Sequence, residues 1–448
     1  MWMCKWALLI LVSIWGPLGL GKGLLPPPGA VAAVELGGWV ADLVFSPDGR
    51  YLALAVRDRI ELRTADDLAS VGSMSLPEGK RAYALAFVDE ARLAAGCADG
   101  TILLLDLPSS SVIAQSRPHA GRVWGIALSP DGEHLASASD DGTVALLWLP
   151  ELSVLHILAA HEDGACSVAF SRDGSLLASG GHDGAIRLFA VPSGRGVAKI
   201  EAHSAAVWGL GFCPEGFLLS AGSDGRAVMW DLSKGRAVRV LAPGVKRVRE
   251  ARLRPGGGLI ALATSDTKVF LWSEGEEAFI GRLLGHKAPL WAVTFSPNGE
   301  YLATLSAAGR LILWDVAKLL ALRPRITGIH YSGRMGRAQY IVVSFADPNG
   351  DASRVTIDLV QGDPVTVFVS SFSVGLETRP SGTGFAPLSP RTLPAEFLIQ
   401  GRWKKGAFTF GLRVDEPQRL ELRIVVVDAL GLSSEARSIG IEAMPPAP

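Results

Sequence analysis

The sequence is poor in charge, with only 19% Asp, Glu, Lys and Arg among 448 residues and a formal net charge of −1. Binding to a nucleic-acid backbone needs a broad positive field, so this balance excludes nucleic acid as the main partner. Hydrophobic residues make up 48% of the chain, which excludes an intrinsically disordered protein. At this length, we expect two or three domains with large cores.

Cysteine is also scarce, with four residues in the whole chain. Cys4 lies in the extreme N-terminus, and Cys97, Cys166 and Cys213 are far apart and form no CxxC or Cys/His cluster. We therefore expect buried free thiols and no metal site built on cysteine. The motifs GxSxG and HExxH and paired catalytic carboxylates are missing too, so the sequence favours a protein that is not an enzyme and needs no cofactor.

The N-terminus carries one long apolar run. Lys5 precedes apolar residues 6–15, and Gly16-Pro17 follows them, which is the pattern of an export signal over residues 1–25. The run is shorter than a comfortable membrane span of about 20 residues, although residues 6–20 could serve as an uncleaved anchor. We therefore expect an exported protein of the periplasm, the cell surface or the extracellular space. Residues 26–31 read as a Pro-rich spacer.

The next part of the chain is repetitive. FSPDG-like turns recur at residues 45–49, 128–132, 170–174, 212–216 and 295–299, each followed by apolar, strand-like segments. An equivalent strand-end residue is expected at positions 63, 105, 148, 189, 230, 272 and 314. The spacings are 42, 43, 41, 41, 42 and 42, so the chain holds seven copies, as in a radial β-architecture.

These repeats resemble the WD-repeat β-propeller family over residues 32–316. The resemblance implies seven blades of four strands. In such a ring, residues 32–36 should pair with residues 311–315 and so remove the free sheet edges.

The resemblance also implies a hydrogen-bonded His–Ser/Thr–Asp–Trp tetrad in several blades. The third and fifth copies would use His119, Ser137, Asp141 and Trp148, and His203, Ser220, Asp224 and Trp230. The fourth has His161, Ser179 and Asp183 with Phe189 in place of Trp, and the seventh has His286, Thr304 and Trp314 with Ala308 in place of Asp. Because the set recurs, we interpret it as a fold-stabilising network and not as a catalytic triad.

In WD-repeat propellers the innermost strands open onto the top face beside the central channel. The first, second and sixth copies lack the tetrad histidine. The position five residues after it, or the equivalent position in those three copies, holds Ala41, Tyr83, Trp124, Cys166, Trp208, Arg249 and Trp291. Trp, Tyr and Arg dominate interface hot spots, so Tyr83, Trp124, Trp208, Arg249 and Trp291 are candidates for binding a protein or peptide. The alternative is that they only cover strand ends.

The sixth copy also holds a basic run. Its members are Lys246, Arg247, Arg249, Arg252 and Arg254. They could recognise an acidic peptide, or simply form a solvated loop and strand edge.

After a linker over residues 317–325, about eight short strand-like segments predict a C-terminal β-sandwich over residues 326–445. Its last hairpin resembles bacterial immunoglobulin-like or fibronectin-type modules. Asp347, Asn349 and Asp351 alternate as calcium ligands do, although a turn capped by their side chains explains them equally well.

The sequence therefore predicts an all-β protein, a seven-bladed propeller followed by a β-sandwich. We expect a non-enzymatic interaction scaffold of the cell envelope, either a monomer or part of a hetero-complex, whose only membrane contact would be an uncleaved N-terminal segment. One alternative is a glycan-binding or adhesive protein that uses the C-terminal domain around Trp403. Another is an envelope enzyme, which would need a polar pocket with perturbed ionisable groups.

Overall fold

The computed structural model describes most of the chain. The described residues are 26–27, 29–149, 151–335, 338–346, 352–361, 366–373, 391–392, 395–398, 405–413, 418–428, 432, 434–435 and 437–443. The predicted export signal, the calcium candidates Asp347, Asn349 and Asp351, and Trp403 lie outside these residues. Among the described residues, no helix is long and apolar enough to cross a membrane.

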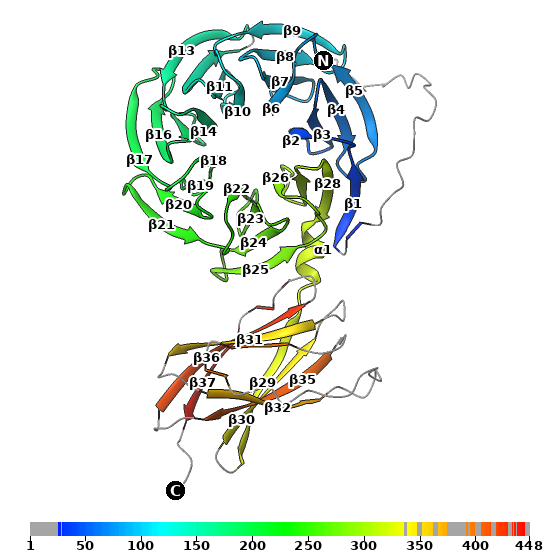
Figure 1. The fold of residues 1–448 in the computed structure, drawn as a ribbon, viewed down its shortest axis with the longest axis vertical. Coiled ribbons are helices and arrows are strands. Elements are labelled where there is room, and N and C mark those ends of the chain that lie inside the picture. Colours follow the sequence, from blue (N-terminus) through cyan, green and yellow to red (C-terminus); the bar gives the residue numbers. More distant parts are fainter. Residues whose placement is uncertain are drawn as a thin grey trace, which may run out of the picture.

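Seven four-stranded antiparallel sheets surround a central axis, which confirms the seven-bladed propeller (Figure 1). In blades 1 to 6 the strands run outward from the axis in chain order, and blade 7 takes its outermost strand from the N-terminal end of the propeller chain. Blades 1 to 3 consist of β2 (Val40–Phe45), β3 (Tyr51–Val56), β4 (Arg59–Thr64) and β5 (Ser70–Ser75); β6 (Ala82–Phe87), β7 (Arg92–Cys97), β8 (Ile102–Asp106) and β9 (Ser111–Ser116); and β10 (Val123–Leu128), β11 (His134–Ser139), β12 (Thr143–Trp148) and β13 (Ser153–Ala159).

The remaining four blades repeat this arrangement. Blades 4 and 5 consist of β14 (Ala165–Phe170), β15 (Leu176–Gly181), β16 (Ala185–Ala190) and β17 (Gly196–Glu201); and β18 (Val207–Phe212), β19 (Leu218–Gly222), β20 (Ala227–Asp231) and β21 (Arg236–Leu241). Blades 6 and 7 consist of β22 (Val248–Leu253), β23 (Leu259–Thr264), β24 (Val269–Ser273) and β25 (Ala278–Leu283); and β26 (Leu290–Phe295), β27 (Tyr301–Ser306), β28 (Arg310–Asp315) and β1 (Ala30–Glu35).

The N-terminal strand closes the ring. β1 pairs antiparallel with β28, with Ala30 opposite Trp314 and Glu35 opposite Arg310. This confirms the pairing expected for residues 32–36. The last blade thereby gains its outer strand from the other end of the propeller chain, and the ring has no open blade.

Four of the seven blades share one turn between their first and second strands. In blade 3, Ser129 Oγ and the N–H of Glu133 both donate to Asp131 Oδ1, and Ser129 Oγ also accepts the N–H of His134. Asp48, Asp173 and Asn298 make the same contacts in their blades. The recurring FSPDG-like motif therefore encodes an Asx-type turn that aims the second strand back along the first.

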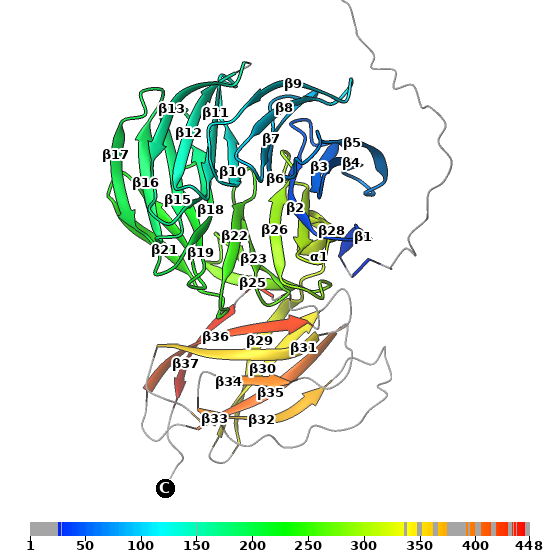
Figure 2. The ribbon, with the colours of Figure 1, turned by 45° about the horizontal axis from the view of Figure 1, so that its top comes forward.

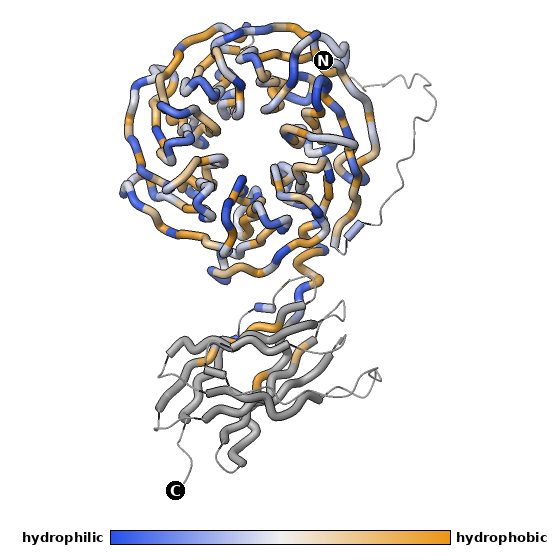
Figure 3. The backbone as a smooth tube through the Cα atoms, in the orientation of Figure 1, coloured by the Kyte–Doolittle hydropathy of each residue, from blue (hydrophilic) through white to orange (hydrophobic). Residues whose placement is uncertain are grey.

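Apolar side chains join the blades. The two middle strands of a blade are buried on both faces, as β11 is along its whole length. One cluster unites blades 1 and 2, with Ala53, Ile60, Leu93 and Leu103 at its centre. Hydrophobic and hydrophilic stretches alternate along the backbone around the ring (Figure 3). Each core cluster joins residues of two adjacent blades, so each sheet packs apolar side chains against both neighbours.

The propeller continues directly into a short helix. α1 (Val316–Ala321) is capped by Asp315, whose side chain accepts the N–H of Lys318 at 2.8 Å. Its residues Val316 and Leu319 are buried in the core of blades 6 and 7. The expected linker of residues 317–325 is thus partly helical and packed on the propeller.

Beyond α1 the described residues form two β-sheets, seen at the lower end of Figure 2. One sheet contains β29 (Arg325–Met335), β30 (Ala338–Ala346), β35 (Lys405–Arg413), β32 (Thr366–Ser373) and β33 (Arg391–Thr392). The other contains β34 (Ala395–Leu398), β31 (Ala352–Gln361), β36 (Gln418–Asp428) and β37 (Arg437–Ala443). The immunoglobulin-like assignment of this region stays a prediction.

Candidate functional site: the aromatic end of the channel

The seven residues of the predicted ring converge at one end of the central channel. Each is the second residue of its innermost strand, and all seven line one cavity of about 150 Å³. In every blade the register between the innermost strand and the next strand shifts at this second residue. In blade 3, for example, the shift lies between Val123 and Gly125, on either side of Trp124. A β-bulge leaves its residue free of the regular alternation, so the side chain can turn toward the axis.

The large side chains meet across the axis. The ring centroid of Trp124 lies 5.4 Å from that of Tyr83, 5.7 Å from that of Trp208 and 6.4 Å from that of Trp291. The first two pairs are edge-to-face, the geometry that aromatic quadrupoles favour. The four aromatic members of the ring therefore form one continuous, half-exposed cluster over the end of the channel.

Two further residues, missed in the sequence, complete this cluster. Trp39 lies 5.0 Å from Tyr83 and 5.6 Å from Trp291 between ring centroids. The Arg122 guanidinium lies 4.4 Å and 4.7 Å above the rings of Tyr83 and Trp124. Trp39 packs against the core cluster that contains the small ring member Ala41. Both new residues stand two positions before a ring residue.

Arg249 sits inside the cluster. Its guanidinium carbon lies 3.7 Å from the ring centroid of Trp208 and 3.8 Å from that of Trp291, so two indoles enclose one cation. Burial lowers the pKa of Arg249 to about 10. The side chain still carries its charge at neutral pH.

Hydrogen bonds fix the three indoles. Trp208 Nε1 donates to Ser223 Oγ at 3.0 Å, and Trp291 Nε1 donates to the carbonyl oxygen of Ala41 at 2.6 Å. Trp124 Nε1 donates to Asp140. Because the polar N–H groups are already satisfied, the cluster offers ring faces and edges to a ligand.

Below the aromatic cluster the channel is polar. Asp42 accepts the N–H of Leu43 and, from the next blade, that of Leu85, both at 2.8 Å. Glu250 likewise accepts the N–H of Val293 of its next blade at 2.8 Å. Burial and the nearby charge of Glu250 raise the pKa of Asp42 to about 7. These carboxylates bridge neighbouring blades, which gives them a structural role.

The basic run of the sixth copy does not form one surface. Arg252 points into the channel, donating to the carbonyl oxygen of Leu210 and pairing with Glu250 at 2.5 Å. Arg254 donates to the carbonyl oxygen of Gly299. Lys246 and Arg247 are exposed on a loop, whereas Arg249 and Arg252 line the channel, so the five cations do not share one face.

The fifth blade contains a complete tetrad. His203 Nδ1 donates to Asp224 at 3.0 Å, its Nε2 lies 2.7 Å from Ser220 Oγ, and Trp230 Nε1 donates to the same Oγ at 2.9 Å. Burial lowers the pKa of His203, which favours the neutral form of the ring. Every member has a partner inside the blade, which fits a structural network.

Two other blades hold the partial tetrads expected. His161 contacts Asp183 and Ser179, both at 2.9 Å, beside the buried Phe189. In blade 7, Trp314 donates to Thr304 at 2.9 Å, and His286 Nε2 lies 2.8 Å from the same oxygen. Within the described chain, Nδ1 of His286 has no hydrogen-bond partner.

The tetrad predicted for blade 3 is wrong in its last member. The pairing of Ser137 with Ala145 and of Leu135 with Leu147 places Leu147, and not Trp148, at the equivalent position. Leu147 is fully buried, whereas Trp148 is 37% exposed and packs edge-on against His134. With Leu147 in place of Trp148, the spacings of 43 and 41 on either side of this position both become 42.

Blade 3 differs in a second respect. His119 Nδ1 lies 3.6 Å from Asp141 Oδ1 but only 2.7 Å from Thr143 Oγ1, which itself donates to Asp141 at 2.6 Å. A hydroxyl thus mediates the contact that is direct in blade 5. His119 keeps its 2.7 Å contact with Ser137.

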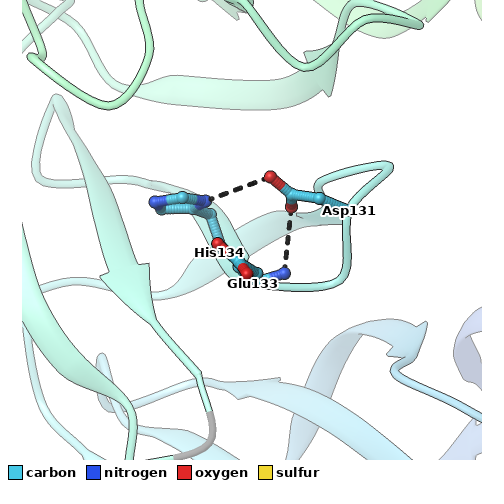
Figure 4. A group of neighbouring side chains, drawn as sticks. All are labelled: Asp131, Glu133 and His134. Carbon is cyan, nitrogen blue, oxygen red and sulfur yellow. Dashed lines mark hydrogen bonds and ion pairs between the residues drawn. The ribbon is translucent and has the colours of Figure 1, made fainter.

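Asp131, Glu133 and His134 form the one group of possible metal ligands found within the described residues (Figure 4). Their ligand atoms lie within 4.8 Å of one another, and His134 Nδ1 is 3.8 Å from Asp131 Oδ2. Asp131 already holds the turn described above, and Trp148 covers the imidazole of His134. We therefore assign the group to the turn.

Comparison with known families agrees with this geometry. The model of the WD domain, G-beta repeat, matches residues 111–146, 152–189, 194–231 and 278–315. The chain contains WD40 repeats. The matched WD40 repeats end in blades 3, 4, 5 and 7, the four blades that carry a tetrad histidine.

WD40 relatives are similar over limited lengths. Pre-mRNA-processing factor 19 homolog 2 of Arabidopsis thaliana is 26% identical over 44% of this chain and 36% of its own length. Transcription initiation factor TFIID subunit 5 of Caenorhabditis elegans is 33% identical over 23% of this chain and 16% of its own. The chain thus spans about a third or less of these relatives. A chain in a crystal structure of the mitotic checkpoint complex shares the propeller fold, with a TM-score of 0.60, 19% identity, and coverage of 69% of this chain and 98% of that chain.

Proposed function

We propose that this protein is a non-enzymatic scaffold that binds a protein or peptide partner on the aromatic end of its propeller. The carrying observation is the half-exposed cluster of Tyr83, Trp124, Trp208 and Trp291 around Arg249. Hydrogen bonds already hold its indoles in place, so a partner would lose little side-chain entropy there. Trp, Tyr and Arg are the residue types that carry most interface energy.

Two comparisons support a role in assemblies. One similar protein is named as a subunit of TFIID, and the structural neighbour belongs to a mitotic checkpoint complex. The four tetrad histidines support a structural and not a catalytic role, because their recurring partners lie inside the blades. We extend the proposal to a C-terminal β-sandwich that acts as a spacer or second docking surface.

The test is affinity capture from a native extract with two matched variants. The first carries Trp124→Ala, Trp208→Ala and Trp291→Ala. The control carries Ile113→Ala, Ile157→Ala and Val240→Ala, which remove apolar side chains at least 50% exposed on the outer strands. We expect partner capture to disappear only in the first variant, with the circular dichroism of both unchanged. The same profile from both variants would contradict the proposal, and single Trp→Ala changes replace the triple variant if it does not fold.

We propose separately that the protein is exported to the cell envelope. The basic residue, apolar run and Gly-Pro of residues 1–25 support export to the cell envelope. Fusing residues 1–30 to a reporter enzyme that is active only outside the cytoplasm tests it. We expect the reporter enzyme to be active in this fusion. Its activity should disappear when two central leucines of the apolar run are replaced by Arg. A reporter that stays inactive in the cell would contradict export.

A further inference from the structure

A basic cleft opens beside the aromatic cluster, between blades 1 and 2. It has a volume of about 770 Å³ and shares Trp39 and Tyr83 with the cluster. Its other walls come from the β3–β4 turn and the loop before β6, and they are Arg57, Asp58, Arg59, Gly79, Lys80 and Arg81. Four cations thus face a single carboxylate.

Two of these cations are already neutralised by the protein. Arg59 Nε donates to Glu61 at 2.9 Å, and Lys80 Nζ pairs with Asp99 at 2.5 Å. The side chains of Arg57 and Arg81 are exposed and make no ion pair or hydrogen bond within the described chain. Two guanidinium groups therefore remain available on either side of the cleft, against one exposed carboxylate, that of Asp58.

The backbone holds Arg57 in an unfavourable conformation. Its φ is +54°, in the left-handed region, where the corresponding turns of five other blades carry glycine. A Cβ atom on Gly38 would lie 2.8 Å from Arg57 Nη2, so the guanidinium rests against a backbone position without a side chain. Residues in such strained backbone conformations cluster at functional sites.

We infer that this cleft binds an acidic segment of a partner polypeptide. Arg57 and Arg81 pair with its carboxylates, and the rings of Trp39 and Tyr83 contact its apolar atoms. The near-neutral net charge of the whole chain favours a short acidic segment over a long polyanion such as nucleic acid. The inference rests on the proposed scaffold function and names the chemistry of the partner.

The probe is a fluorescent peptide of about eight residues, mostly Glu and Asp with one Phe, followed by fluorescence polarisation with the full-length protein. We expect Arg57→Gly and Arg81→Gln each to weaken binding about tenfold, and Arg57→Lys to weaken it less. Arg57→Gly also removes the backbone strain, so its thermal midpoint should equal or exceed that of the wild type. Arg172→Gln, an exposed arginine in a turn at the opposite end of the blades, should bind like the wild type.

Several results would overturn the inference. One is unchanged binding by the double variant Arg57→Gly/Arg81→Gln, and another is equal binding of a peptide with Gln and Asn in place of Glu and Asp. A third is preferential binding of single-stranded RNA at about 150 mM salt, which would make the cleft a general polyanion site. If the tryptophan variants abolish partner capture while the double variant does not, the inference fails and the scaffold function stands. If neither set changes capture, both fail.

Discussion

The guanidinium carbon of Arg249 lies 3.7 Å from the ring centroid of Trp208, with Trp291 on its other side. A planar cation between two aromatic faces combines electrostatic attraction with close packing. Arg249 is thus a structural part of the aromatic cluster as well as a candidate contact.

Replacing Arg249 by Lys should therefore destabilise the protein. An ammonium group keeps the charge but cannot stack flat on two indoles at once, and we expect a loss of about 1 kcal/mol in the free energy of unfolding. Urea titration followed by near-ultraviolet circular dichroism measures this loss. A variant as stable as the wild type would show that the two stacking contacts contribute nothing.

Replacing Ser220 by Ala tests the complete tetrad. The change leaves Trp230 Nε1 and His203 Nε2 buried without their shared partner, which should cost about 2 to 4 kcal/mol. Ser233→Ala, in an exposed turn of the same blade, is the control and should cost less than about 1 kcal/mol. Equal losses in chemical denaturation would mean that the network adds little.

The register of blade 3 gives a third prediction. Leu147→Ala should cost about 2 to 4 kcal/mol, because it empties a fully buried site. Trp148→Ala should cost only about 1 kcal/mol, since this larger side chain is 37% exposed and mainly covers His134. The reverse order in thermal or urea unfolding would restore Trp148 to the tetrad.

Blade 7 gives a prediction about pH. Burial, together with the charge of Arg310, lowers the pKa of His286 to about 3. In the unfolded chain the imidazole of His286 becomes protonated below about pH 6.5, whereas in the folded chain it stays neutral until about pH 3. The free energy of unfolding is therefore unaffected by this group above about pH 6.5 and decreases as the pH falls from about 6.5 to about 3. At pH 5 we expect the free energy of unfolding to be lower by about 2 kcal/mol.

Ala308→Asp should reduce this acid sensitivity. The new carboxylate would accept the Nδ1–H of His286, as Asp224 accepts that of His203, and would raise the pKa of His286. We expect a gain of about 1 kcal/mol at pH 7 and a larger gain at pH 5, measured by urea unfolding at both values. Ala307→Asp adds the same charge one residue away and should not reproduce the effect. Identical behaviour of both variants would rule out the hydrogen bond as the cause.

The repeat period was enough to predict the propeller, because seven recurring turns and strand-sized apolar runs leave few other solutions. The ring residues were predictable for the same reason, since each stands at a fixed distance within its copy. Trp148 shows the limit of this reasoning. Two adjacent residues of a strand face opposite sides of the sheet, and only the register of the strands, in which Ser137 pairs with Ala145, decides whether Leu147 or Trp148 points inward.

Trp39 and Arg122 were missed because they lie in loops, where no periodicity assigns a direction to a side chain. A signal did exist, since both precede a ring residue by two positions and Ala41 leaves room for a larger neighbour. The cleft of Arg57 was likewise beyond prediction. It depends on a left-handed arginine and on the approach of two loops from different blades.

The pairing of β1 with β28 has a mechanical consequence. The chain enters the propeller just before Ala30 and leaves it just after Asp315, at the same end of this strand pair, where Ala30 faces Trp314. Tension between the two ends would therefore separate the strands one residue pair at a time, as a zipper opens, and would not shear all their hydrogen bonds at once. The last pair to part would be Glu35 and Arg310, which also form an ion pair at 3.1 Å.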